Sequence, residues 1–128
     1  MILDSSALVS IVLKEAGYES LAQKAHLARS IFVSAPTALE TAMVLSGRTG
    51  EDARPLIAAL LRRLGAEIVD FNEHHYEAAI SAFLRFGKGR HPAGLNFGDC
   101  IAYALSALTG LPLLFTGEDF KQTDVQCA

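Results

Sequence analysis

The chain has 128 residues, of which 51% are apolar and 20% are charged, and this composition excludes a disordered or fibrous protein. The length is that of one domain. A net charge of −3 excludes a protein that coats nucleic acid through a general excess of basic residues. Only Cys100 and Cys127 are present, so a disulfide framework is excluded and both thiols are expected to be free.

The beginning of the chain has no features of a targeting segment. Asp4 stands where a signal peptide carries basic residues. The apolar stretch at residues 7–13 is far shorter than the roughly 20 residues that cross a bilayer. We therefore expect a cytoplasmic protein in a reducing environment, without contact with a membrane.

Short apolar strands alternate with helical patterns along the chain. The predicted elements are a strand at 2–3, a helix from Ser5 or Ser6 to Gly17, a helix at 18–28, a strand at 31–33, a helix that ends at Gly47, a helix from about 51 to Gly65, a strand at 67–71, a helix at 73–86, a helix from Asn96 or Phe97 to Gly110, and a strand at 111–115. In the helix at 73–86, Tyr76, Ile80 and Phe83 are expected to face the core. This alternation predicts an α/β fold with a parallel sheet covered on both faces.

Four acids lie where such a sheet would bring them together. Asp4 directly follows the first strand, Asp99 lies in the first turn of its helix, and Asp119 follows the last strand. Glu40 lies within an apolar helical segment, where a buried charge needs a partner. Because ligands bind beyond the carboxyl ends of the strands in open sheets, these four side chains are candidates for one site.

A cluster of acids needs something that offsets its repulsion. Two carboxylates about 5 Å apart repel by about 3 kcal/mol at an effective dielectric constant near 20. Protonation is one answer, and a bound divalent cation is the better one. Oxygen ligands with no thiolate among them favour Mg²⁺ or Mn²⁺ over Zn²⁺.

Each acid also has a purely structural interpretation. Asp4 and Asp99 suit the start of a helix, where the helix dipole favours a negative charge. Glu40 suits an ion pair with an arginine or contact with solvent, and Asp119 suits a turn. Asp70 also follows a strand, but we expect it to lead into a helix and leave it out of the site.

Three blocks of sequence, in order, carry a resemblance to a known family. They are residues 1–8 (MILDSSAL), 96–100 (NFGDC) and 113–120 (LLFTGEDF), with Glu40 between the first two. These blocks resemble PIN-domain proteins and, among them, the VapC toxins. The similarity extends over nearly the whole chain.

The resemblance implies a single PIN domain over residues 1–128, with a three-layer α/β/α sandwich around a mainly parallel sheet. It also implies a Mg²⁺-dependent endoribonuclease, for which Mn²⁺ can substitute, acting as the toxin of a type II toxin–antitoxin pair. The implied partners are an RNA substrate, a VapB-like antitoxin and a second copy of the chain in a homodimer. The implied catalytic residues are Asp4, Glu40, Asp99 and Asp119, with Asp4 and Asp99 as metal ligands. The products would carry 5′-phosphate and 3′-hydroxyl ends.

Other residues receive roles around these acids. We expect the basic residues at 85–91, which are Arg85, Lys88, Arg90 and His91, to contact RNA phosphates, and a solvated loop is the alternative. Ser6 and Thr116 have the right chemistry to hydrogen-bond the carboxylates or a phosphate, or to serve only as a cap and a turn. Cys100 is expected to be a small buried residue, and His26, His74 and His75 are expected on the surface.

Several alternatives to the toxin remain open. A phospho-acceptor signalling domain has paired acids after its first strand, but here Ser5 follows Asp4. A dinucleotide-binding module needs a glycine fingerprint that is absent at this point. A PIN-like module that binds without cleaving, and a PIN nuclease that processes RNA outside a toxin–antitoxin pair, both fit the same blocks.

Overall fold

The computed structural model describes all residues from 1 to 128. Helices and strands alternate as the sequence pattern predicts. Their bounds are β1 Ile2–Leu3, α1 Ser5–Leu13, α2 Tyr18–Leu27, β2 Ile31–Ser34, α3 Ala35–Thr49, α4 Arg54–Leu64, β3 Ala66–Val69, α5 Glu73–Phe86, α6 Phe97–Thr109, β4 Leu113–Leu114 and the 3₁₀ helix η1 Asp119–Gln122.

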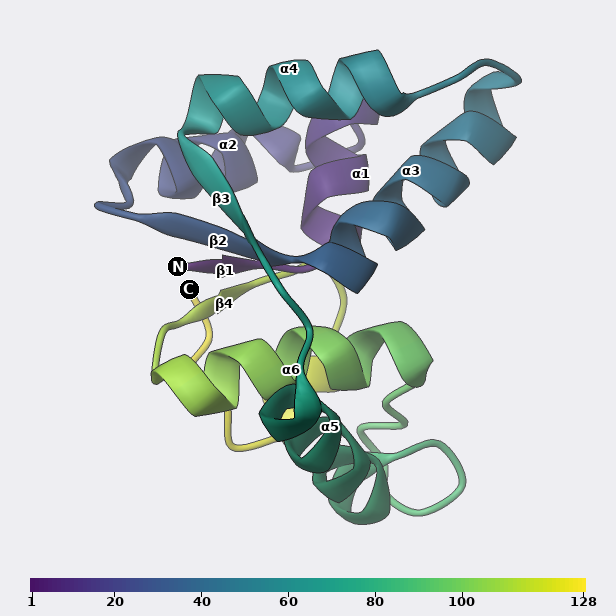
Figure 1. The fold of residues 1–128 in the computed structure, drawn as a ribbon, viewed down its shortest axis with the longest axis vertical. Helices are drawn as coiled ribbons and strands as arrows, with labels where there is room; N and C mark the ends of the chain where they lie inside the picture. The colour runs from purple at the N-terminus through teal and green to yellow at the C-terminus, as the bar shows by residue number, and fades with distance from the viewer.

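The four strands form one sheet in the order β3-β2-β1-β4, and every neighbouring pair is parallel. The ends of the chain extend this sheet, since Leu113 forms a parallel bridge with Cys127 and the Met1 amino group donates to the carbonyl of Ser30. Parallel strands all end on the same edge, so β1, β2 and β4 deliver the residues that follow them to one place. The two termini lie side by side at the other end of the strands (Figure 1).

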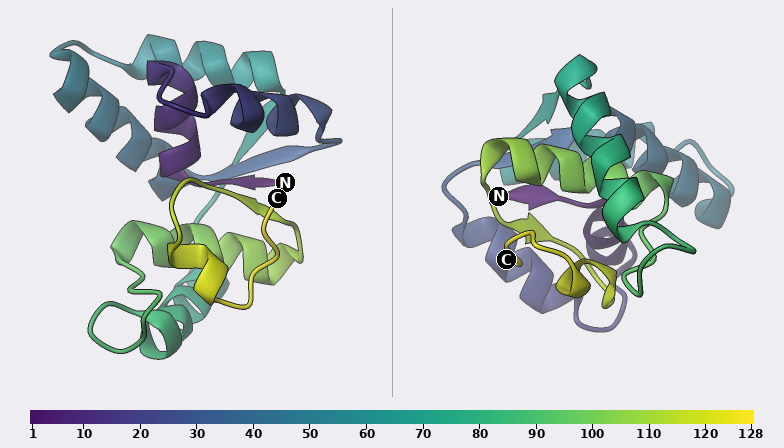
Figure 2. Two further views of the ribbon diagram at one scale, coloured as in Figure 1. Left: turned by 180° about the vertical axis from the view of Figure 1, so that it is seen from behind. Right: turned by 90° about the horizontal axis from the view of Figure 1, so that it is seen from below.

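Two apolar cores lie on the two faces of the sheet. On one face α1, α2, α3 and α4 cover Leu3, Ile31 and Val33. On the other face α5, α6 and η1 cover Ile2 and Leu113 (Figures 1 and 2). Successive residues of β1 enter opposite cores, as the alternation of a strand requires. The predicted α/β fold with a sheet covered on both faces is confirmed, and both cysteines are free.

Two details of the predicted helices are wrong. Helix α3 passes through Gly47 and ends at Gly50, whose φ of 75° suits a left-handed end that no other residue type adopts as easily. In α5, Tyr76 and Ile80 face outward, whereas Phe83 packs against the core as predicted, beside the buried Ala82 and Phe86. The apolar residues of α5 are too many for one stripe, so periodicity alone did not select the buried face.

His75 is a third correction, because it is buried rather than on the surface. Its ring lies 2.9 Å from the Asn72 side chain, and the pair forms a capping box at the start of α5. His26 and His74 are exposed, as predicted. No helix here combines the length and the apolar character that spanning a membrane requires.

Candidate functional site

Asp4 lies at the carboxyl end of β1 and is almost completely buried. Its Oδ2 accepts hydrogen bonds from the backbone N–H and the hydroxyl of Ser6, at 2.9 and 2.5 Å, and so caps α1. Its Oδ1 is buried without a hydrogen-bond partner in the protein. Burial raises the pKa of Asp4, although the two bonds from Ser6 oppose the rise. Asp4 is therefore the cap that the structural interpretation expects, with one oxygen left over.

Ser6 ties the ends of two strands together around Asp4. Its hydroxyl donates to the Asp4 carboxylate and accepts from the backbone N–H of Thr116, at 3.0 Å, just beyond β4. The role of Ser6 as a partner of a carboxylate is thus observed. Thr116 takes part through its backbone, not through its hydroxyl.

Glu40 reaches the same region from α3. A Cβ atom added to Gly98 would lie 2.5 and 2.6 Å from the two Glu40 carboxylate oxygens, so the carboxylate packs directly against the first turn of α6. Its Oε2 is buried without a partner, and no arginine pairs with it. Burial raises the pKa of Glu40, and the charge of Asp4 adds to the rise while Ser5 opposes it.

Asp99 lies in the first turn of α6 and forms a capping box with Asn96. Its Oδ2 accepts from the Asn96 backbone N–H at 2.8 Å, and its own N–H donates to the Asn96 side chain at 3.0 Å. Burial raises the pKa of Asp99 to about 6, and the charges of Asp4, Asp119 and Glu40 add to the rise. One Asp99 oxygen thus bonds back to the N-cap residue of α6, and only this oxygen has a hydrogen-bond partner in the protein.

Asp119 occupies the outer rim of this acidic cluster. It is exposed at the start of η1, and its charge acts on Asp99. The neighbouring Glu118 forms an exposed ion pair with Lys121. Asp70 is exposed beyond β3 and contributes to none of these pKa shifts. The structure thus brings Asp4, Glu40 and Asp99 together, with Asp119 beside them.

The acids line an open cluster rather than a closed cage. No three His, Cys, Asp or Glu side chains are grouped tightly enough to enclose a metal ion among themselves. The free oxygens of Asp4 and Glu40 are nevertheless hard, charged donors with nothing else to bind. Mg²⁺ suits this donor set, because it binds through one or two carboxylates and keeps several of its water molecules. That these residues hold a metal stays a prediction.

Sequence reasoning missed two residues beside this cluster. Ser34 ends β2 and Thr37 lies in the first turn of α3, and both are buried with hydroxyl oxygens that have no partner. Small hydroxyl residues at the start of a helix are typical caps, so their types gave no signal of another role. Thr37 lies three residues and Ser34 six residues before Glu40, and this spacing was the only sign in the sequence that they belong to the site.

Near the acids, Cys100 is an unreactive thiol, whereas Lys88 and Arg90 are basic residues without ion pairs. Burial, with a contribution from the Asp99 charge, raises the pKa of the Cys100 thiol to about 11, so this thiol is a packed, protonated group rather than a nucleophile. Lys88 and Arg90 are exposed without acidic partners, and the Arg90 guanidinium lies 5.4 Å from the ring centre of Phe83. They are available to bind phosphate.

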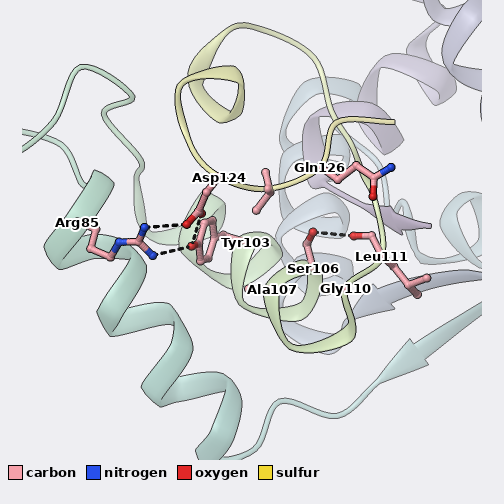
Figure 3. A pocket seen from close by; sticks show the side chains of 9 residues that line it. Arg85, Tyr103, Ser106, Ala107, Gly110, Leu111, Asp124 and Gln126 are labelled. Carbon is pink, nitrogen blue, oxygen red and sulfur yellow. Dashed lines mark hydrogen bonds and ion pairs between the residues drawn. The ribbon is translucent and has the colours of Figure 1, made fainter.

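Arg85, in contrast, belongs to a separate cluster of paired groups. It bonds Asp124 at 2.7 Å, and the Tyr103 hydroxyl donates to the same carboxylate at 2.7 Å (Figure 3). These side chains line a cavity of about 450 Å³ that runs along the second half of α6 and also includes Gly110 and Leu111. Arg85 is therefore engaged away from the acids, and its predicted contact with phosphate has no support.

Comparisons of the sequence find relatives over nearly its whole length. A model of the PIN domain matches residues 1–126. Ribonuclease VapC36 of Mycobacterium tuberculosis is 44% identical over 127 residues, which covers 98% of this chain and 91% of that protein. Ribonuclease VapC of Mycolicibacterium smegmatis is 42% identical over 125 residues, which covers 98% of this chain and 97% of that protein.

Solved structures share the fold at lower identity. VapC20 of Mycobacterium tuberculosis, described as a sarcin-ricin loop cleaving toxin, superposes with a TM-score of 0.78 at 17% identity, covering 97% of this chain and 95% of that one. A toxin–antitoxin complex from Klebsiella pneumoniae gives a TM-score of 0.68 at 18% identity, covering 96% and 92%. At these identities the superpositions show the shared α/β/α architecture.

Proposed function

We propose, because this chain belongs to the PIN-domain family and within it to the VapC ribonucleases, that it is a Mg²⁺-dependent endoribonuclease acting as the toxin of a toxin–antitoxin pair. Family membership confirms the resemblance drawn from residues 1–8, 96–100 and 113–120. The observation that carries the proposal is the meeting of buried Asp4 with the half-buried Glu40 and Asp99, all three with raised pKa values and two of them, Asp4 and Glu40, with unpartnered oxygens.

Asp4 and Asp99 would hold the cation through the oxygens that do not cap helices. A bound Mg²⁺ polarises a phosphoryl oxygen, lowers the pKa of an attacking water and stabilises the leaving oxygen. The N-termini of α1 and α6 support the ionised form of both ligands. Asp119, at the exposed rim, would act through water.

Glu40 would orient the attacking water and accept its proton. A carboxylate in this role works best when its pKa is raised toward the working pH, and burial together with Asp4 shifts Glu40 in that direction. Gly98 lets the Glu40 carboxylate come close to Asp99, because any larger residue would occupy the same space. The predicted products are RNA fragments with 5′-phosphate and 3′-hydroxyl ends.

An apolar surface beside the acids supports the proposal that this protein binds protein partners. Phe97 is 84% exposed, and Leu39 and Met43 are also exposed next to Glu40. Two adjoining cavities of about 410 and 450 Å³ share Phe97 and Ile101. A monomer rarely leaves such a patch in water, so we propose that the antitoxin and a second copy of the chain cover it. The pair would act in the cytoplasm, where RNA is accessible.

The test is expression of the chain with and without the protein encoded by its upstream neighbour. Expression alone should arrest growth and cut cellular RNA, and co-expression should relieve both effects. The Asp99→Asn variant should cause neither effect. Purified protein should cut RNA with Mg²⁺ and stop when the cation is chelated. Cleavage that continues in the variant or in chelator would refute the metal mechanism, and Mg²⁺-dependent cleavage without relief by any antitoxin would point to an RNA-processing nuclease.

A further inference from the structure

Four buried side-chain oxygens in this protein have no hydrogen-bond partner, and all four belong to one end of the sheet. They are Asp4 Oδ1, Ser34 Oγ, Thr37 Oγ1 and Glu40 Oε2. Ser34 and Thr37 are only 2% and 1% exposed, so bulk water does not reach their hydroxyls. Buried polar groups are nearly always paired, and four exceptions in one place need a common explanation.

The strand register shows which way Asp4 and Ser34 point. Ile2 pairs with Phe32, so Asp4 and Ser34, each two residues further on, lie level with each other. Ile2 and Phe32 pack into the core beneath α6, and the backbone stays extended at both Asp4 and Ser34. Because residues two apart in a strand share a face, both side chains point toward α6, the helix that carries Asp99.

Thr37 connects this pair to Glu40 along α3. Ser34, Thr37 and Glu40 follow one another at intervals of three residues, so they succeed each other along one side of the helix start. At the far end of this row, the Glu40 carboxylate meets Gly98 of α6. The four free oxygens therefore border a single polar region between β1, β2, α3 and α6.

Neither hydroxyl is used in the way its position in the helix would suggest. Ser34 is the N-cap residue of α3, yet its side chain makes no capping bond. Thr37 does not bond back to a backbone carbonyl, whereas the equally buried Thr41 donates to the Thr37 carbonyl at 2.7 Å. The contrast within one helix leaves Ser34 and Thr37 free for a group that does not belong to the backbone.

We propose that Ser34 and Thr37 are positioning residues of the cation site, whose hydroxyls bind the water molecules that surround the cation between Asp4 and Glu40. The inference rests on the proposed function. A hydroxyl suits this place because its free oxygen can accept a hydrogen bond from a cation-bound water. Mg²⁺ and Mn²⁺ retain water when carboxylates bind them, and outer groups of this kind orient that water.

The test compares Thr37→Val with Thr41→Val, which removes the matching hydroxyl one turn along the same helix. Thr37→Val should weaken Mn²⁺ affinity by about tenfold in calorimetry, as expected for groups that orient metal-bound ligands, and leave the melting temperature of the metal-free protein unchanged or higher. Thr41→Val should lower that temperature and keep the affinity. Thr37→Ser should restore the affinity, and Ser34→Ala should weaken it as Thr37→Val does.

Unchanged Mn²⁺ affinity in both Thr37→Val and Ser34→Ala would overturn this inference. So would a lowered melting temperature in Thr37→Val that matches Thr41→Val, since the hydroxyl would then be structural. If Thr37→Val fails to fold, Ser34→Ala and Thr37→Ser decide the question by the same measurements. Failure of the proposed function is seen separately, because the wild type would then neither bind Mn²⁺ nor cut RNA.

Discussion

Two charged clusters along α6 differ in how their charges are compensated. In the first turn of α6, Asp99 meets Asp4, Glu40 and Asp119, and no basic side chain compensates for them. In the middle of α6, the Tyr103 hydroxyl shares the Asp124 carboxylate with Arg85 of α5 (Figure 3). The pKa of Asp124 is accordingly lowered, chiefly by Tyr103, while that of Asp99 is raised by burial. The paired cluster is typical of a structural contact, and the unpaired acids are the candidates for function.

The largest expected effect comes from removing one charge from each cluster. Asp4→Asn should lower Mg²⁺-dependent RNA cleavage by about 100-fold or more, because metal-ion catalysis contributes several kcal/mol. Asp124→Asn should leave cleavage within about twofold of the wild type. Initial rates on a labelled RNA, with both variants at equal concentration, measure the contrast. Equal losses in the two variants would contradict the distinction between the acidic cluster and the paired cluster.

Gly98→Ala tests the acidic cluster by moving the Glu40 carboxylate without removing a charge. The added methyl group would overlap the Glu40 carboxylate, which is the flexible end of its side chain and would have to shift from its present position. We expect cleavage to fall by about 10- to 100-fold, as a displacement of a reacting group by about 1 Å can cause. Stability should hold or rise, since alanine favours a helix over glycine by about 1 kcal/mol. A parallel loss of cleavage and melting temperature would contradict this view of Gly98.

The metal-free protein should lose stability as pH rises through about 6. The pKa of Asp99 rises from its ordinary value of 3.8 to about 6, so the folded chain keeps a proton that the unfolded chain has released. This contribution is fully present below the ordinary pKa and is lost above the raised one. Burial raises the pKa values of Asp4 and Glu40 in the same direction.

Thermal unfolding at pH 5 and pH 7 measures this dependence. The melting temperature without metal should be higher at pH 5, and the difference should shrink in Asp99→Asn and with saturating Mg²⁺. Asp52 and Asp124 titrate below this window, because their pKa values are lowered. The same pH dependence in wild type and Asp99→Asn would show that its source lies elsewhere.

Tyr103→Phe removes a hydrogen bond from the paired cluster of Arg85, Tyr103 and Asp124. Tyr103 is buried, and its hydroxyl donates to Asp124 at 2.7 Å. Losing this bond should cost about 1 kcal/mol and lower the melting temperature by about 4 °C, with no change in the rate of RNA cleavage. A variant that melts like the wild type but cuts RNA more slowly would give this cluster an unexpected role in function.

The smallest effect concerns the two free basic residues before α6. Replacing both Lys88 and Arg90 by Ala should reduce the slope of RNA affinity against salt concentration by about 2, if each residue contacts one phosphate. Affinity measured by fluorescence anisotropy at several salt concentrations, with the inactive Asp4→Asn chain as background, tests this. An unchanged slope would make the segment an ordinary solvated loop.

Much of the fold could be predicted from patterns that are visible in the sequence. Ile2 and Leu3 before Asp4, and glycines at Gly65 and Gly110, mark the strand and helix ends where the structure has them. The prediction that a helix ends at Gly47 was wrong, because glycine only weakens a helix interior and does not end the helix there. The buried face of α5 was mispredicted because its apolar residues are too many for one stripe, and the burial of His75 was missed because its ring completes a cap with Asn72.

Only part of the candidate site could be predicted from the sequence. Charged residues at strand ends stand out in a sequence, so Asp4, Glu40, Asp99 and Asp119 were found. Ser34 and Thr37 were not, because their distinction is a hydrogen bond that is not made. The pairing of Arg85 with Asp124 was equally hidden, since it joins residues far apart in the chain.

The divided use of Asp4 and Asp99 has a consequence for inactive forms of the protein. In each carboxylate, Oδ2 accepts a backbone N–H at the start of a helix, and the Oδ1 of Asp4 is buried without a partner. An asparagine at either position still offers an oxygen to the same backbone N–H, so a mutation that silences the enzyme need not unfold it. We expect such an inactive variant still to bind the antitoxin. It would then leave less antitoxin for the active molecules in the same cell.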